Sequence, residues 1–295
     1  MQPEHYLRIR AAANAVAAAS HSKLPHTLCR RLFARVKAEV EIGDFNGSQR
    51  MRLDLSEHMR RRIFWMGHYS RDVVATLQWL LQPGMHFVDI GANIGEITLT
   101  AGKIVGAYGS VTAFEPVDAI AGKLAQHLLW NDLTWCTLER LALSDHQGSA
   151  EIFASTGNNG TWDPHDGLAS LHNIDQSRVP VQQVRLDTLD HYFLEHPIRA
   201  LDGIKIDIEG AELECLRGAE ATLRSYQPWL IVEVQSQTSA AAGYEQRQIL
   251  DFLTGLGYQF YKTGNARPHA IAANDLSAIQ NVLCLHQTRH ANLGV

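Results

Sequence analysis

The stretch VDIGANIG, residues 88–95, decides the fold, because a short apolar run passes through a glycine turn into a helix. We predict a buried strand over His86–Ile90 and a helix from about Ile94 to Val105. Gly91 lacks a Cβ atom where the chain must turn sharply, which lets a ligand lie against bare backbone. Gly95 allows the helix to pack closely, and the helix N-terminus offers free N–H groups.

Outward from this turn, strands and helices alternate along the chain. Alternation of this kind with nearly continuous apolar strands predicts a doubly wound α/β fold with a mostly parallel sheet covered on both faces. The further expected strands are Ser110–Glu115, Cys136–Leu143, Gly203–Ile208, Trp229–Val234, Tyr258–Tyr261 and Asn281–Leu285. The further expected helices are Val117–Trp130, Ala211–Leu223 and Gln246–Leu256.

The residues before this alternation predict an N-terminal extension over 1–69 and a main domain over 70–295. Apolar residues at helical spacing predict an amphipathic helix in the extension, and the dipeptide Asn46-Gly47 between two alternating runs predicts a β-hairpin. Another helix is expected to begin at Ser70 as N-cap and to end at Pro83-Gly84. The apolar residues of the extension helix are Leu24, Leu28, Leu32, Phe33 and Val36.

The main domain carries an insertion over residues 149–185. Ala150–Ala154 and Val179–Val184 are expected to pair as strands, and they bracket the polar stretch Ser155–Arg178. A loop of that length in a compact domain is typically a functional lid or disordered. We expect it to close over a bound substrate.

The composition is that of an ordinary globular protein, with 295 residues, 45% hydrophobic and 19% charged. No apolar run reaches the ~20 residues that span a bilayer, so no membrane partner is expected. The Ala-rich stretch Ala11–Ala19 predicts a surface helix rather than a signal peptide. Four widely spaced cysteines indicate reduced thiols and a cytoplasmic location.

Charge is distributed unevenly within the net value of −5. Residues 1–71 carry 13 Lys and Arg against 6 Asp and Glu, so this part is basic and the remainder acidic. The basic part can attract an anionic substrate or partner, or it can simply pack on the acidic body. No basic stripe with interleaved aromatic residues is present, so no nucleic-acid partner is expected. A homo-oligomer is compatible with this composition.

Two acids stand at the ends of consecutive predicted strands. Asp89 precedes Gly91 by two residues, where a carboxylate can meet the α-amino group of an amino-acid moiety. Glu115, in the sequence Phe114-Glu115-Pro116, can accept hydrogen bonds from both hydroxyls of a ribose. The alternative is a nicotinamide-dependent oxidoreductase, which Asp89 and the absence of a G-x-G-x-x-G spacing disfavour.

The third chemical element is KIDIEGAE, residues 205–212. Strand alternation places its isoleucines on one face and Lys205, Asp207 and Glu209 on the other. Three charges on one face of an interior strand are costly unless they are paired or used. Ion pairs of Lys205 with Asp207 or Glu209 are the structural alternative. Because ligands of open α/β sheets bind beyond the carboxyl ends of the strands, this position favours a functional role.

Together the VDIGANIG turn, the FEP acid, the segment Ala142-Leu143-Ser144-Asp145 and KIDIEGAE resemble the FkbM family of class I methyltransferases, over roughly Phe64–Gln235. The resemblance implies a seven-stranded sheet in the order 3-2-1-4-5-7-6 with an antiparallel seventh strand. It also implies transfer of a methyl group from S-adenosylmethionine to a hydroxyl of a polyketide, a sugar or another small natural product.

The resemblance also implies a set of cofactor-binding residues. Those expected at the methionine end are Asp89, Gly91, Ala92 and Asn93. Glu115, followed by Pro116, is expected at the ribose. Ala142 and Leu143 are expected at the adenine, and Asp207 is expected beside the sulfonium.

An alcohol is a poor nucleophile at neutral pH, so a base or a metal must help to remove its proton. The candidates for this role are Asp207, Glu209, Glu233 and His68. Asp207 and Glu233 end adjacent strands and can share Mg²⁺, or they can bind substrate hydroxyls directly. His68 is alternatively a structural residue. The polar loop offers a second candidate metal site, although a solvated loop without a metal is the favoured interpretation. The residues of this second metal set are Asp163, His165, Asp166 and His172.

Two further functions compete with a small-molecule methyltransferase. A catalytically silent binding module is disfavoured by the presence of both cofactor acids and the charged strand. A nucleic-acid amino-methyltransferase often carries an Asn/Asp-Pro-Pro-aromatic element after the fourth strand, and here that position reads Asp207-Ile208-Glu209-Gly210.

Overall fold

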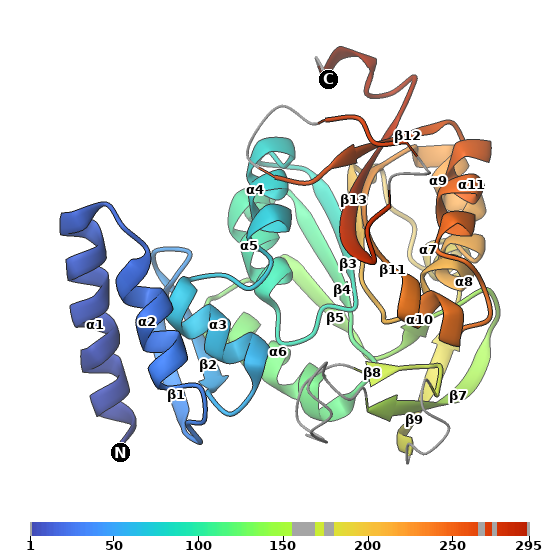
Figure 1. The fold of residues 1–295 in the computed structure, drawn as a ribbon. Coiled ribbons are helices and arrows are strands. Elements are labelled where there is room, and N and C mark those ends of the chain that lie inside the picture. Colours follow the sequence, from blue (N-terminus) through green and yellow to red (C-terminus); the bar gives the residue numbers. More distant parts are fainter. Residues whose placement is uncertain (1, 155–168, 174–179, 265–268, 273–275, 294–295) are drawn as a thin grey trace.

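The computed structural model describes residues 2–154, 169–173, 180–264, 269–272 and 276–293 (Figure 1). Most of the predicted lid, 155–178, and the residues Asp163, His165 and Asp166 of the second metal set lie outside these ranges. Among the described helices, none is long and apolar enough to cross a membrane. All four cysteines are described, and none of them forms a disulfide.

The large sheet has seven strands within the described ranges, in the order β12-β13-β11-β10-β3-β4-β5. Numbered along the chain within this sheet, the order is 6-7-5-4-1-2-3, which confirms the expected class I methyltransferase topology. β13 is antiparallel to both of its neighbours, and the other pairs of neighbours are parallel. The strands are β3 (His86–Ile90), β4 (Ser110–Phe114), β5 (Cys136–Glu139), β10 (Gly203–Ile206), β11 (Trp229–Gln235), β12 (Tyr258–Lys262) and β13 (Ile279–His286).

Helices cover both faces of this sheet (Figure 1). Alternate residues of β3 and β10 face opposite sides, so Val88 and Ile204 pack under α7, α8, α9 and α11, while Phe87 packs under α4 and α5. The helices are α4 (Arg71–Leu80), α5 (Glu96–Val105), α6 (Asp118–Trp130), α7 (Leu189–Glu195), α8 (Glu212–Arg217), α9 (Glu220–Tyr226), α10 (Ser236–Ala241) and α11 (Arg247–Gly255). Two short 3₁₀ helices span Gly106–Tyr108 and Ala291–Leu293.

The N-terminal extension lies at one side of the sheet, next to α5 and α6 (Figure 1). The predicted hairpin turns at Asn46 and Gly47, which both have positive φ. Buried residues of the hairpin and of α3 share one apolar cluster with residues of α5 and α6, so the extension has no separate core. Its elements are α1 (Pro3–Ser20), α2 (Leu24–Leu32), β1 (Glu39–Phe45), β2 (Gln49–Asp54) and α3 (His58–Met66).

The expected amphipathic helix of the extension forms, but its apolar repeat does not face the core. Leu24, Leu28 and Leu32 are 61%, 49% and 78% exposed. Phe33 and Val36, which follow the helix, pack on the shared cluster instead. Spacing alone predicted the helix, but none of its residues is buried.

The insertion and the preceding strand β6 form a small sheet in the order β6-β9-β7-β8. β7 and β9 pair antiparallel, as expected. The prediction of one strand over Cys136–Leu143 was wrong, because the chain leaves the large sheet after Glu139 and β6 pairs with β9. The strands are β6 (Ala142–Leu143), β7 (Gly148–Ala154), β8 (Ala169–Ser170) and β9 (Pro180–Asp187).

Other differences are local. The expected helix Ala211–Leu223 is interrupted at Gly218, where a Cβ atom would lie 2.0 Å from the backbone oxygen of Ser144. Ser70 occupies the N-cap position of α4, but its side chain makes no capping hydrogen bond. The sequence patterns also missed α3, α7 and α10.

Candidate active site

An open pocket with about 1020 Å³ of empty space lies beyond the carboxyl ends of β3, β4, β10 and β11. The extension and the insertion both contribute to its walls, so three parts of the chain meet there. Residues from the large sheet and its loops include Gly91, Ala92, Asn93, Phe114, Glu115, Pro116, Lys205, Asp207, Glu209 and Glu233. Residues from the extension, from β6 and from the insertion include Met59, Tyr69, Ala142, Leu143, Ile152, Ala169 and Leu171.

The turn after β3 is fixed by backbone contacts on both sides. The N–H groups of Gly91 and Ala92 donate to the carbonyl of Phe114. Gly91 has φ +77°, and a Cβ atom there would lie 1.9 Å from the backbone oxygen of Asp207. Glycine is therefore required because the loop after β10 approaches the turn, a reason that the sequence did not indicate. At Gly95, as expected, a Cβ atom would meet Leu124 of α6.

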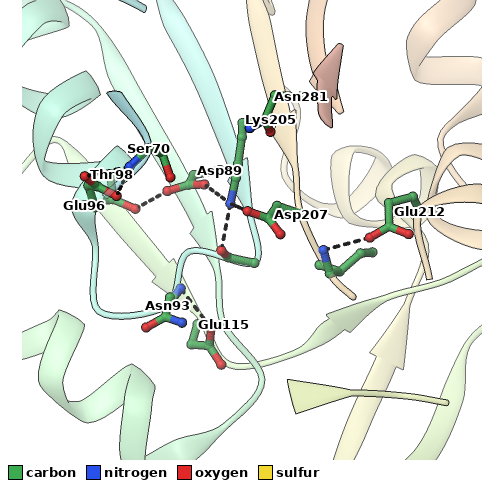
Figure 2. Close-up of polar contacts among 12 residues, drawn as sticks. Ser70, Asp89, Asn93, Glu96, Thr98, Glu115, Lys205, Asp207, Glu212 and Asn281 are labelled. Carbon is green, nitrogen blue, oxygen red and sulfur yellow. Dashed lines mark hydrogen bonds and ion pairs between the residues drawn. The ribbon is translucent and has the colours of Figure 1, made fainter. Parts of the chain in front are cut away.

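Glu115 is buried at the end of β4 (Figure 2). Its two carboxylate oxygens accept the backbone N–H groups of Asn93 (2.9 Å) and Val117 (3.0 Å). Burial raises the pKa of Glu115 to about 7 against the effect of these bonds. Each oxygen retains a further lone pair, so the carboxylate can still accept two hydroxyl groups from a ligand in the pocket.

Asp89 does not occupy the position that the sequence predicted. Its side chain is fully buried, accepts the Thr98 hydroxyl at 2.6 Å and lies 3.6 Å from the Lys205 ammonium nitrogen (Figure 2). It is not among the residues that line the pocket. The expected direct contact with an amino group is corrected to a supporting role beneath the turn, because the alternation of β3 aims this side chain toward α5.

Three carboxylates gather at the ends of β10 and β11. One oxygen each of Asp207, Glu209 and Glu233 lies within 4.8 Å of the other two. The strand alternation predicted for Glu209 is wrong, because β10 ends at Ile206 and Glu209 has φ +54°. A tight loop nevertheless returns Glu209 to the cluster. The negative charge of Asp207, followed by burial, raises the pKa of Glu233 well above its usual value, so the cluster favours an added proton or cation.

The loop that carries Asp207 and Glu209 is stabilised by hydrogen bonds to Glu212. The buried Glu212 carboxylate accepts the N–H groups of Ile208 (3.0 Å) and Gly210 (3.0 and 3.1 Å). Its other contact is the hydroxyl of Tyr244, at 3.2 Å.

Tyr69 faces the pocket from the joint between the extension and the main domain. Its backbone N–H donates to Glu96 at 2.6 Å, and the N–H of Ser70 donates to the same carboxylate. Burial first, and then Asp207 and Glu233, raise the pKa of Tyr69 to about 12, so the phenol stays protonated. No motif in the sequence marks Tyr69 as a residue of this pocket.

His68 lies beside this joint but not in the wall of the pocket. Its Nδ1 atom is 3.5 Å from Glu96, and its ring packs on Phe45 at 5.2 Å. This placement gives the predicted catalytic role of His68 no support. His172 likewise lies 3.4 Å from Glu214 and outside the pocket wall.

The chain matches a known family over more than half of its length. Residues 89–260 match the family described as the methyltransferase FkbM domain. The chain is 25% identical over 249 residues to the AMB antimetabolite synthetase AmbE of Pseudomonas aeruginosa, covering 75% of this chain and 11% of that protein. It is 27% identical over 133 residues to a probable cobalt-precorrin-6B C(15)-methyltransferase (decarboxylating) of Thermoplasma acidophilum, covering 43% of this chain and 64% of that one.

Among solved structures, the methyltransferase FkbM of Methylobacillus flagellatus is similar with a TM-score of 0.45 and 18% identity, covering 72% of this chain and 47% of that chain. The chain thus spans less than two thirds of each of these three relatives.

Proposed function

The chain belongs to the FkbM family of methyltransferases, and we propose that it transfers a methyl group from S-adenosylmethionine to a hydroxyl group of a small molecule. The observation that supports this proposal is the pocket in which Glu115, the glycine turn and the carboxylate cluster meet. The family match favours this activity over a nicotinamide-dependent oxidoreductase and a silent binding module.

The residues of the pocket fit the cofactor. Glu115 offers a free lone pair on each oxygen to the ribose hydroxyls. Ala142 and Leu143 present an apolar surface to an adenine ring, next to Pro116. We place the methionine end along Ala92 and Asn93, with Asp89 supporting the turn from below. S-adenosylmethionine, when bound, supplies an activated methyl group on a sulfonium.

The chain's own residues then align and activate the acceptor. Asp207 borders the pocket at the end of β10, where its carboxylate can face the sulfonium and the incoming hydroxyl. We assign it the orienting or proton-accepting role. Tyr69 stays protonated and can donate a hydrogen bond to an acceptor oxygen. The apolar residues Met59, Ile152 and Leu171 exclude water around the reacting atoms.

The carboxylate cluster also fits a divalent cation. One oxygen each of Asp207, Glu209 and Glu233 is close enough to bind one ion. Glu209 is thereby added to the predicted metal ligands Asp207 and Glu233. Mg²⁺ would there lower the pKa of a bound acceptor hydroxyl. Without a metal, the same acids would bind acceptor hydroxyls directly.

The cofactor assignment predicts that Glu115→Ala weakens binding of S-adenosylhomocysteine. The expected loss is about 1.5–3 kcal/mol, the scale of charge-assisted hydrogen bonds left unmade. Isothermal titration calorimetry measures it, with Glu139→Ala as the control because Glu139 does not line the pocket. Equal affinity of Glu115→Ala and wild type would remove Glu115 from the site.

The acceptor assignment is tested by methyl transfer from labelled S-adenosylmethionine. A panel of hydroxylated small molecules and, separately, RNA are offered as acceptors, and the product is analysed by mass spectrometry. We expect label in an O-methyl group of a small molecule. Label in RNA, or on nitrogen or carbon, would contradict the proposed reaction.

A further inference from the structure

A buried cation lies between the glycine turn and the Asp207 carboxylate, and the mechanism above does not use it. Lys205 lies at the centre of β10, and its side chain is 6% exposed. Register pairs it with Asp89 on the neighbouring strand β3. A buried ammonium group is costly unless all of its donors are satisfied.

The Lys205 ammonium nitrogen lies near three acceptor oxygens, one at hydrogen-bond distance and two at ion-pair distance (Figure 2). The nitrogen donates to the carbonyl oxygen of Gly91 at 3.0 Å. It forms ion pairs with Asp207 at 3.4 Å and Asp89 at 3.6 Å. Gly91 belongs to the cofactor turn and Asp207 to the carboxylate cluster, while Asp89 lies beneath the turn.

We propose that Lys205 is a positioning residue, whose ammonium group joins the Gly91 turn to the Asp207 carboxylate so that the cofactor and the acceptor are held in one fixed geometry. The proposal rests on the proposed function, since the turn and Asp207 are its cofactor and acceptor sites. Mutual repulsion of Asp89 and Asp207 would otherwise push the two acids apart, and the Gly91 carbonyl would lose its donor.

The neighbouring carboxylates keep Lys205 in its charged form. The carboxylates of Asp207 and Asp89 outweigh burial and raise the pKa of Lys205 above its usual value. Lys205 therefore stays protonated and cannot serve as the base that takes the acceptor proton. No side chain at position 91 can replace this contact, because Gly91 has no room for a Cβ atom.

Calorimetry with S-adenosylhomocysteine tests the role of Lys205 in holding the turn. Lys205→Met is expected to weaken binding at least ~10-fold, because the turn carbonyl loses a hydrogen bond from a charged donor. Lys262→Met is the matched control, since Lys262 is exposed on β12 of the same sheet. Wild-type affinity in Lys205→Met would overturn the proposal.

Lys205→Met leaves Asp89 buried without a cation, which can prevent folding. The variant Asp89→Asn/Lys205→Met removes both charges and is compared with Asp89→Asn alone. We expect the double variant to bind S-adenosylhomocysteine at least ~10-fold more weakly than Asp89→Asn. Equal affinity of the two would show that Lys205 only balances the charge of Asp89, and would overturn the proposal.

A spectroscopic measurement on the wild-type protein distinguishes a positioning role of Lys205 from a contribution to folding stability alone. Nitrogen-15 NMR of the lysine side chains should show one slowly exchanging ammonium signal that is absent in Asp89→Asn/Lys205→Met. We expect this signal to shift in Asp207→Asn and when S-adenosylhomocysteine is added. A signal that responds to neither change would refute the role. If wild type binds no S-adenosylhomocysteine at all, the proposed cofactor site fails, while the response to Asp207→Asn still tests the contact itself.

Discussion

Asp207→Asn should lower the rate of methyl transfer by on the order of 10²-fold or more, with little loss of folding stability. The substitution keeps the shape of the side chain but removes the charge that faces the sulfonium and the acceptor hydroxyl. It also removes the basic oxygen that could accept the proton of the hydroxyl. The rate is measured with labelled S-adenosylmethionine under saturating cofactor, and folding is followed by thermal unfolding.

Asp251→Asn is the matched control for this change. Asp251 lies on α11, with its side chain 57% exposed, and it is absent from the pocket wall. Adding EDTA to the wild-type enzyme distinguishes the two roles of the cluster. A loss that Mg²⁺ restores assigns the cluster to a metal, whereas unchanged activity assigns the acids to direct contact with the acceptor. Wild-type turnover in Asp207→Asn would show that Asp207 is structural.

Gly91→Ala should reduce affinity for S-adenosylhomocysteine by about 100-fold or more, because the new Cβ atom would force the turn away from its strained backbone conformation. The clash is with backbone rather than a flexible side chain, since the nearest atom is the carbonyl oxygen of Asp207 at 1.9 Å. The turn and the loop after β10 must therefore separate. Calorimetry measures the affinity, and circular dichroism confirms that the variant folds.

Gly84→Ala separates the clash from the backbone strain of this substitution. Gly84 has φ +88°, similar to Gly91, but a Cβ atom there would meet no atom within 4 Å. We expect Gly84→Ala to bind S-adenosylhomocysteine as wild type does and to lose only stability. If both variants keep wild-type affinity, the turn does not contact the cofactor.

The sequence predicted the sheet well because its strands are short, apolar and bounded by clear turns. The order of the strands came from the family resemblance, and the structure confirms it. Strand ends were less predictable. Local pattern could not show that the chain leaves the large sheet after Glu139, because that choice depends on pairing with β9, which lies some forty residues further along.

The site was predicted in part. The pocket brings together Gly91, Glu115 and Asp207 as expected. Asp89 was misplaced, because residue spacing does not show whether a side chain at a strand end points into the pocket or beneath it. Tyr69 was missed, because its position depends on the backbone bond to Glu96, a contact between two parts of the chain that no motif joins.

We propose that S-adenosylmethionine binds across Glu115, the glycine turn and Asp207. Crystallography of the protein with S-adenosylhomocysteine shows where the cofactor lies. We expect density with both ribose hydroxyls on Glu115, the adenine between Pro116 and Leu143, and the sulfur beside Asp207. Density elsewhere, or no density at saturating ligand in well-ordered crystals, would contradict it.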